Sequence, residues 1–270
     1  MSVEELAALH RRPEVVACDV RWYLTDPTRG RREYDEAHLP GAVFVDLHDE
    51  LAGGPGGGRH PLPRVEDFTA LLGRLGIEPA STVVAYDDAG GAIAARLWWM
   101  LRSIGHERVA VLDGGYSAWV AAGQPLTSDI PAVPTRSYPA VGSWTGTVTA
   151  DEVADSIVEG GTVIDARAEE RYRGDTEPVD PQAGHIPGAR NLPHMDNLTA
   201  YGTHHSPEQL TERFGDLGDK PIVYCGSGVT ACHDLLAMAV AGVTGGRLYP
   251  GSWSEWSSDP DRAVETASGS

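Results

Sequence analysis

Residues 185–189 read His-Ile-Pro-Gly-Ala, and residues 38–42 read His-Leu-Pro-Gly-Ala. Three further pairs of segments match in the same order, 137 to 147 residues apart: Val16–Arg21 with Val163–Arg167, Val83–Asp87 with Ile222–Cys225, and Gly114–Trp119 with Gly251–Trp256. Ordered matches at a nearly constant spacing indicate two copies of one fold. We therefore predict one domain at residues 1–125, a second at 145–270, and between them a proline-containing linker at 126–144.

Within each copy, short apolar runs alternate with longer segments of helical periodicity. Val83–Tyr86, Val109–Leu112 and Pro221–Tyr224 have the pattern of buried strands, and Val65–Leu75 and Thr230–Ala241 have that of helices. This alternation predicts an α/β fold in which each domain is a parallel sheet flanked by helices. In such a sheet, the loops that follow the carboxyl ends of the strands are the expected ligand positions.

Composition excludes several classes of protein. The chain has 21 basic and 39 acidic residues, so a formal charge of −18 disfavours nucleic acid and anionic membranes as partners. No apolar run approaches the roughly 20 residues of a membrane span. The acidic segment Met1–Leu9 is not a targeting peptide, and three sparse cysteines are not a disulfide framework, so we expect a cytoplasmic protein. No spacing of cysteines or histidines predicts a metal site.

The segment that carries chemistry is Tyr224-Cys225-Gly226-Ser227-Gly228-Val229-Thr230-Ala231-Cys232, which follows a predicted strand and opens a predicted helix. Its two glycines let successive N–H groups converge on one centre, and the start of the helix adds positive potential. Both effects stabilise a thiolate, so Cys225 is the predicted nucleophile. The alternative, an inert core cysteine, is the interpretation we give to Cys18 and Cys232.

The loop Cys225–Ala231 resembles the active-site loop of rhodanese-like sulfurtransferases, in the form typical of 3-mercaptopyruvate sulfurtransferases. The segments Asp165–Arg167, Arg171–Gly174, Gly184–Ala189 and Gly251–Trp256 resemble the family's other signatures in family order. This resemblance implies two similar domains, of which only the second is catalytic. Asp87 stands where the second copy has Cys225, so the first domain is predicted to be inactive.

The resemblance also implies a double displacement. Cys225 takes sulfane sulfur from a small anionic donor, 3-mercaptopyruvate or thiosulfate, and passes it to cyanide or to a thiol, either a small thiol or a thioredoxin-like protein. It implies no cofactor. The predicted catalytic residues are Cys225, Ser227 and His60, and the predicted substrate-binding residues are Arg171 and the loop residues Gly226, Gly228, Val229 and Thr230.

Three of these residues have alternative interpretations. Arg171 supplies a local positive charge for an anionic donor, or it is a surface residue paired with Glu169, Glu170 or Asp175. Ser227 matches a family serine that helps to protonate the leaving group, with a histidine and an aspartate as partners. His60 is the predicted histidine, although a solvent-facing histidine would fit the same loop. The aspartate stays unassigned, because Asp46 and Asp49 flank His48 at the expected position.

The choice of donor also stays open. Thiosulfate-preferring relatives carry bulky cations directly after the cysteine, and Gly226 and Ser227 stand there instead, which favours mercaptopyruvate. Some mercaptopyruvate enzymes have a second arginine after a Glu-Pro pair, whereas Glu177-Pro178 has none after it, which argues the other way.

Two other functions use the same cysteine. A non-catalytic persulfide carrier needs Cys225 but none of Ser227, His60 and Arg171. A cysteine phosphatase needs an arginine six residues after the cysteine, and that position holds Ala231. The phosphatase is therefore disfavoured, and the carrier remains the alternative to an enzyme.

Overall fold

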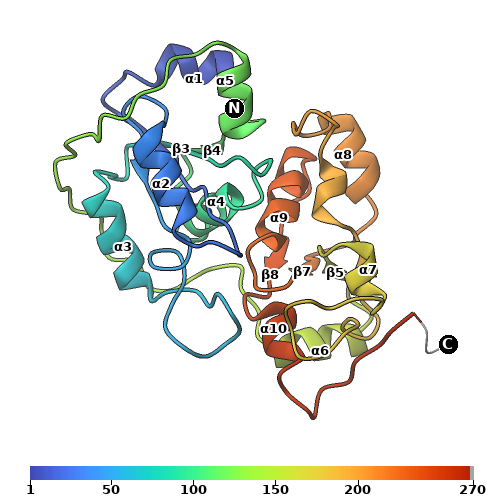
Figure 1. Ribbon diagram of the computed structural model, residues 1–270. Helices are drawn as coiled ribbons and strands as arrows, with labels where there is room; N and C mark the ends of the chain where they lie inside the picture. The colour runs from blue at the N-terminus through green and yellow to red at the C-terminus, as the bar shows by residue number, and fades with distance from the viewer. Residues whose placement is uncertain (268–270) are drawn as a thin grey trace. The chain divides into compact units, whose positions relative to one another are not determined.

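The computed structural model describes residues 1–267, which form two units with one parallel sheet each (Figure 1). The first unit contains Met1–Gly53, Leu62–Thr145 and Ala200–Thr203. The second contains Gly54–Pro61, Gly146–Thr199 and residues 204–267. The loop that carries His60 thus packs as part of the second unit.

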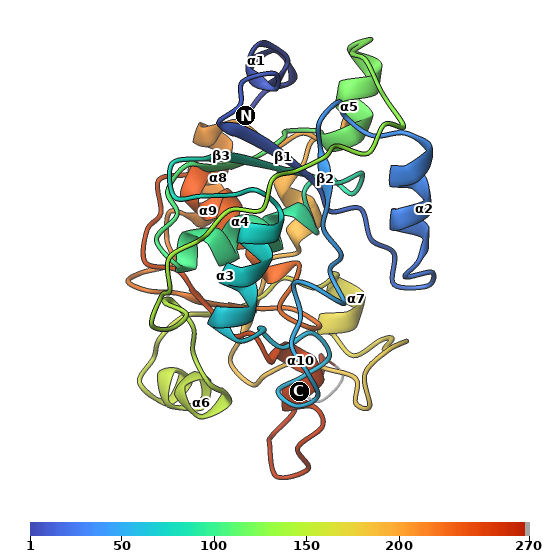
Figure 2. The same ribbon diagram turned by 90° about the vertical axis from the view of Figure 1, so that its left-hand side faces the viewer.

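The first unit has the strand order β2-β1-β3-β4, with all neighbours parallel. Its elements are α1 (Val3–Leu9), β1 (Val15–Asp19), α2 (Arg29–Glu36), β2 (Val43–Phe44), α3 (Val65–Arg74), β3 (Thr82–Tyr86), α4 (Ala94–Ser103), β4 (Val109–Val111) and α5 (Gly115–Ala121). Helices α1 and α5 lie on one side of the sheet, and α3 and α4 lie on the other (Figures 1 and 2). A capping box of Ser2 and Glu5 begins α1.

The second unit repeats this plan with the order β6-β5-β7-β8. Its elements are α6 (Ala150–Val158), β5 (Val163–Asp165), α7 (Glu169–Tyr172), β6 (Arg190–Asn191), a 3₁₀ turn at His194–Asn197, α8 (Pro207–Phe214), β7 (Ile222–Tyr224), α9 (Ala231–Val240), β8 (Arg247–Leu248) and α10 (Ser252–Trp256). Trp253 and Trp256 are buried in the core that α6 and α10 form against the sheet. The predicted α/β fold with two parallel sheets is confirmed.

Matching contacts show why the His-x-Pro-Gly-Ala turn occurs twice. The ring of His38 stacks on Tyr34 with 3.9 Å between centroids, and His185 stacks on Tyr172 at 3.7 Å. In each pair the histidine Nδ1 lies within 2.7 Å of the tyrosine's own carbonyl oxygen. The same contacts therefore hold this turn in both units.

The proline-containing segment 126–144 has no helix or strand and packs within the first unit. At its end, the indole N–H of Trp144 donates to the carbonyl of Pro63 at 2.8 Å, and its ring contacts Phe68 of α3 and Trp99 of α4. These contacts hold the end of the linker against α3 and α4.

Candidate active site

Cys225 directly follows β7 and precedes the loop that opens α9. Its side chain is almost fully buried, at 1% exposure. Its N–H donates to Ser252 Oγ at 3.1 Å, and its carbonyl accepts from the N–H of Trp253 at 2.9 Å. The first turn of α10 therefore holds the backbone of the cysteine from outside the loop.

The glycine at position 228 is required by its surroundings. Gly228 has φ +74°, and a side chain there would place its Cβ 2.5 Å from the carbonyl oxygen of Pro250. Both the left-handed backbone and the close approach exclude any other residue without a shift of the chain. Of the two glycines in the loop, Gly228 has a positive φ and Gly226 does not.

Ser227 and His60 lie within hydrogen-bond distance of each other. Ser227 Oγ is 2.9 Å from His60 Nδ1, and both side chains are buried. The chain beside His60 is fixed as well, because the N–H of Arg59 donates to Ser254 Oγ at 3.0 Å. The structure thus brings together the two residues that the sequence paired, and it places His60 away from the solvent.

Arg171, at the end of α7, is held by two carboxylates that the sequence did not predict as its partners. Its guanidinium donates to Glu177 at 2.7 Å and to Asp180 at 3.1 Å. Both carboxylates are nearly buried, whereas Arg171 is 21% exposed. Burial opposes ionisation of Glu177, but the hydrogen bonds from Arg171 and from two backbone N–H groups outweigh it and lower its pKa.

Arg59 is a site residue that the sequence analysis did not single out. Its Nη1 donates to Asp180 Oδ1 at 2.6 Å, so one carboxylate bridges Arg59 and Arg171. A Cβ on Gly226 would lie 3.1 Å from Arg59 Nη2 and 3.5 Å from Arg171 Nη1. Two guanidinium groups therefore lie against the residue that follows Cys225.

Beneath this cluster, Asp165 and Arg167 form a buried ion pair with 2.6 Å between Oδ2 and Nη2. Arg167 also contacts Glu177 at 3.3 Å. The first unit has the same pair in Asp19 and Arg21, again at 2.6 Å. Arg167 therefore pairs within its own unit, as Arg21 does in the first.

The Rhodanese-like domain family matches residues 2–122 and again residues 149–259. The chain belongs to this family. A Pseudomonas aeruginosa protein named "Probable 3-mercaptopyruvate sulfurtransferase" is 43% identical over 282 residues, which are 98% of this chain and 97% of that protein. Mouse thiosulfate sulfurtransferase is 38% identical over 259 residues, which are 90% of this chain and 85% of that protein.

Solved structures agree with this assignment. The crystal structure of SseA from Escherichia coli, a 3-mercaptopyruvate sulfotransferase with the rhodanese fold, has a TM-score of 0.81 and 32% sequence identity. The match covers 94% of this chain and 98% of that one. The predicted resemblance and the predicted class, a sulfurtransferase, are confirmed by these relatives.

In the first rhodanese-like domain, Asp87 stands at the position that matches Cys225 of the second. Asp87 Oδ1 accepts the N–H groups of Ala89 and Gly91, and Oδ2 accepts those of Ile93 and Ala94, all at 2.8 or 2.9 Å. Asp87 is fully buried. Four backbone N–H groups of this loop therefore bind the carboxylate of Asp87. Such a ring of N–H groups is an anion-binding loop, and here a side chain of the chain itself occupies it.

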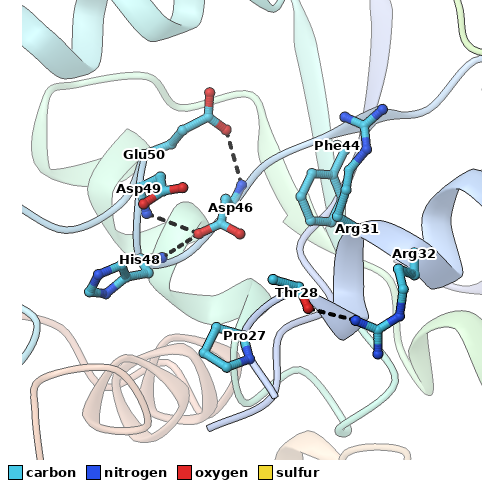
Figure 3. A pocket seen from close by; sticks show the side chains of 9 residues that line it. All are labelled: Pro27, Thr28, Arg31, Arg32, Phe44, Asp46, His48, Asp49 and Glu50. Carbon is cyan, nitrogen blue, oxygen red and sulfur yellow. Dashed lines mark hydrogen bonds between the residues drawn. The ribbon is translucent and has the colours of Figure 1, made fainter. Parts of the chain in front are cut away.

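The unassigned aspartates lie in the same domain, on the wall of a cavity of about 690 Å³ (Figure 3). Asp46 Oδ1 accepts the N–H groups of His48 at 2.7 Å and Asp49 at 2.9 Å. Arg31 and Arg32 of α2 line the cavity opposite this turn. Asp46 therefore stabilises its own loop, and the aspartate partner of His60 stays unassigned.

No helix within residues 1–267 is both long enough and apolar enough to cross a membrane.

Proposed function

We propose that this protein moves sulfane sulfur from a small anionic donor to a thiol or to cyanide through a persulfide on Cys225. The observation that carries the proposal is the contact with His60 made by Ser227, which lies two residues after Cys225. A persulfide carrier has no use for such a buried polar pair, which can move a proton. The acceptor is a small thiol or a thioredoxin-like protein in a cytoplasmic location, where the three free cysteines stay reduced.

In the first half of the reaction, the Cys225 thiolate attacks the thiol sulfur of 3-mercaptopyruvate or the outer sulfur of thiosulfate. A sulfur–sulfur bond forms, and the bond between that sulfur and the rest of the donor breaks with its electron pair. From 3-mercaptopyruvate the leaving group is an enolate, which takes a proton through Ser227 and His60 and becomes pyruvate. From thiosulfate the leaving group is sulfite, which is stable as an anion.

In the second half, the acceptor thiolate or cyanide attacks the outer sulfur of the Cys225 persulfide. The new bond forms as the bond to Cys225 breaks, and the thiolate is regenerated. The N–H groups of the loop from Gly226 to Thr230 stabilise the negative sulfur in both halves. Arg171 binds the anionic end of the donor.

The first test is a steady-state comparison of 3-mercaptopyruvate and thiosulfate as donors, with cyanide and with a thiol as acceptors. We expect turnover of both, with the higher kcat/KM for 3-mercaptopyruvate because only that donor uses the proton-transferring pair. A preference for thiosulfate would mean that the loop and Arg171 are enough to bind and turn over that anion, without a contribution from Ser227 and His60. If neither donor is turned over, the proposed enzymatic activity is contradicted and a non-catalytic persulfide carrier is favoured.

Replacing Ser227 or His60 with Ala should act on one donor only. We expect kcat with 3-mercaptopyruvate to fall about 100-fold, the typical contribution of a positioned proton donor. Turnover of thiosulfate should change little, since sulfite needs no proton to leave. An equal loss with both donors would show that the pair only maintains the loop, and it would remove the proton-transfer step.

A further inference from the structure

The charges around the cysteine loop differ from those expected from the sequence. The chain carries a formal charge of −18, and the two positions after Cys225 hold no cation. An anionic donor should therefore be repelled from the loop. In the structure, guanidinium groups from outside the loop occupy this place, because Gly226 has no side chain to keep Arg59 and Arg171 away.

Arg59 is held in position by contacts on both sides. Its backbone N–H donates to Ser254 Oγ at 3.0 Å, and its Nη1 donates to the Asp180 carboxylate at 2.6 Å. The preceding residue, Gly58, is packed so closely that a Cβ there would lie 2.5 Å from the carbonyl oxygen of Gly251. Arg59 is therefore oriented before a donor arrives, and its binding needs little reorganisation.

Asp180 holds the two cations together. Its two carboxylate oxygens bind Arg59 and Arg171 separately, and its side chain is only 2% exposed. Without such a bridge, two neighbouring guanidinium groups would repel each other. The Asp180 bridge uses Nη1 of Arg59 and Nη2 of Arg171, whereas Nη2 of Arg59 and Nη1 of Arg171 are the atoms nearest to Gly226.

One nitrogen of Arg59 still needs an acceptor. Its Nε is buried and has no hydrogen-bond partner among residues 1–267. A buried N–H without an acceptor costs about 1–3 kcal/mol, so the position of Arg59 depends on its contacts with Ser254 and Asp180. The guanidinium as a whole is still reachable, since the side chain of Arg59 is 26% exposed.

We propose that Arg59 is a donor-binding residue and that Arg59 and Arg171 together form a two-guanidinium clamp for the donor's anionic end. Planar guanidinium groups suit the carboxylate of a 2-keto acid and the sulfonate-like end of thiosulfate equally well. The clamp rests on the proposed function. Asp180 and Glu177 balance the two cations, so the clamp offers an anion directed guanidinium N–H groups and no net positive charge. Because these N–H groups lie beside Gly226, the lack of cations at Gly226 and Ser227 does not exclude thiosulfate.

The test compares Arg59→Ala, Arg59→Lys and the unaltered enzyme with both donors. Arg59→Ala should raise KM about tenfold for each donor, while the rate at which an uncharged thiol unloads a preformed Cys225 persulfide stays within about twofold. Arg59→Lys keeps the charge but not the planar fork, and its KM should lie between the two. Arg173→Ala is the control. Arg173 is half exposed, and its replacement removes the same charge from the protein without changing Arg59, Arg171 or Asp180.

Gly226→Ala is a second probe, which leaves both arginines in the chain. The added methyl group would displace Arg59 Nη2 from its 3.1 Å approach, so KM should rise for both donors. An unchanged KM in Arg59→Ala and Gly226→Ala, with normal turnover by the unaltered enzyme, would overturn the clamp and leave the proposed function standing. A loss of kcat with 3-mercaptopyruvate alone would also overturn it, because Arg59 would then act only by positioning His60.

Discussion

Replacing Cys225 with Ser is expected to abolish sulfur transfer and leave the protein folded. A hydroxyl group has nearly the same shape as the thiol, but it cannot form or release a persulfide. The backbone contacts of Cys225 with Ser252 and Trp253 do not involve its side chain. We therefore expect the free energy of unfolding to change by less than about 1 kcal/mol, as for other substitutions that create neither a cavity nor an unpaired charge.

Two measurements check this result: thiocyanate formation from either donor, and the mass of the donor-treated protein. The mass should increase by one sulfur atom in the unaltered protein and stay constant in Cys225→Ser. Cys232→Ser is the matched control, since Cys232 is also buried and its Sγ lies 3.3 Å from the Gly228 carbonyl. Transfer that survives in Cys225→Ser would refute the persulfide mechanism.

Much of the site could be predicted because the repeat distinguishes structure from chemistry. Features present in both copies, such as the Asp-Arg pair and the His-x-Pro-Gly-Ala turn, have the same contacts in both units. Features present in one copy, above all Cys225, are the candidates for catalysis. The pairing of Ser227 with His60 came from the family resemblance, and the structure places the two side chains in contact.

The partners of the arginines could not be predicted in the same way. A long arginine side chain reaches many neighbours, so its partner depends on how separate loops close and not on distance along the chain. The alternative interpretation of Arg171 paired it with acidic residues within four positions, but its side chain binds Glu177 and Asp180. The sequence analysis did not single out Arg59 because its place in the site depends on its approach to Gly226. Gly226 is 167 positions away and has no side chain that could indicate the contact.

The sequence predicted only part of the role of Asp87. A carboxylate at the nucleophile position predicts an inactive domain, but not that four backbone N–H groups converge on it. An isolated anionic side chain could not stay fully buried without such partners. The first domain thus keeps an anion-binding loop and fills it with a residue of its own.

Replacing Asp87 with Ala should therefore destabilise the protein strongly and change the turnover of the folded enzyme little. The substitution leaves four N–H groups in a buried loop without an acceptor, and each unsatisfied group costs about 1–3 kcal/mol. Allowing for water that enters the vacated space, we expect a loss of about 3–6 kcal/mol in the free energy of unfolding. Denaturant unfolding and kcat per folded molecule measure the two effects separately.

The neighbouring carboxylate, Asp88, provides the control, because it is exposed and Asp88→Ala should cost less than about 1 kcal/mol. Formate should then stabilise Asp87→Ala more than the unaltered protein, since its carboxylate can occupy the same four N–H groups and binding to the folded state raises stability. A stability equal to that of Asp88→Ala, with no effect of formate, would show that the loop does not depend on an anion. A large loss of kcat in the folded variant would instead contradict the inactive-domain assignment, because Asp87 would then serve the reaction itself.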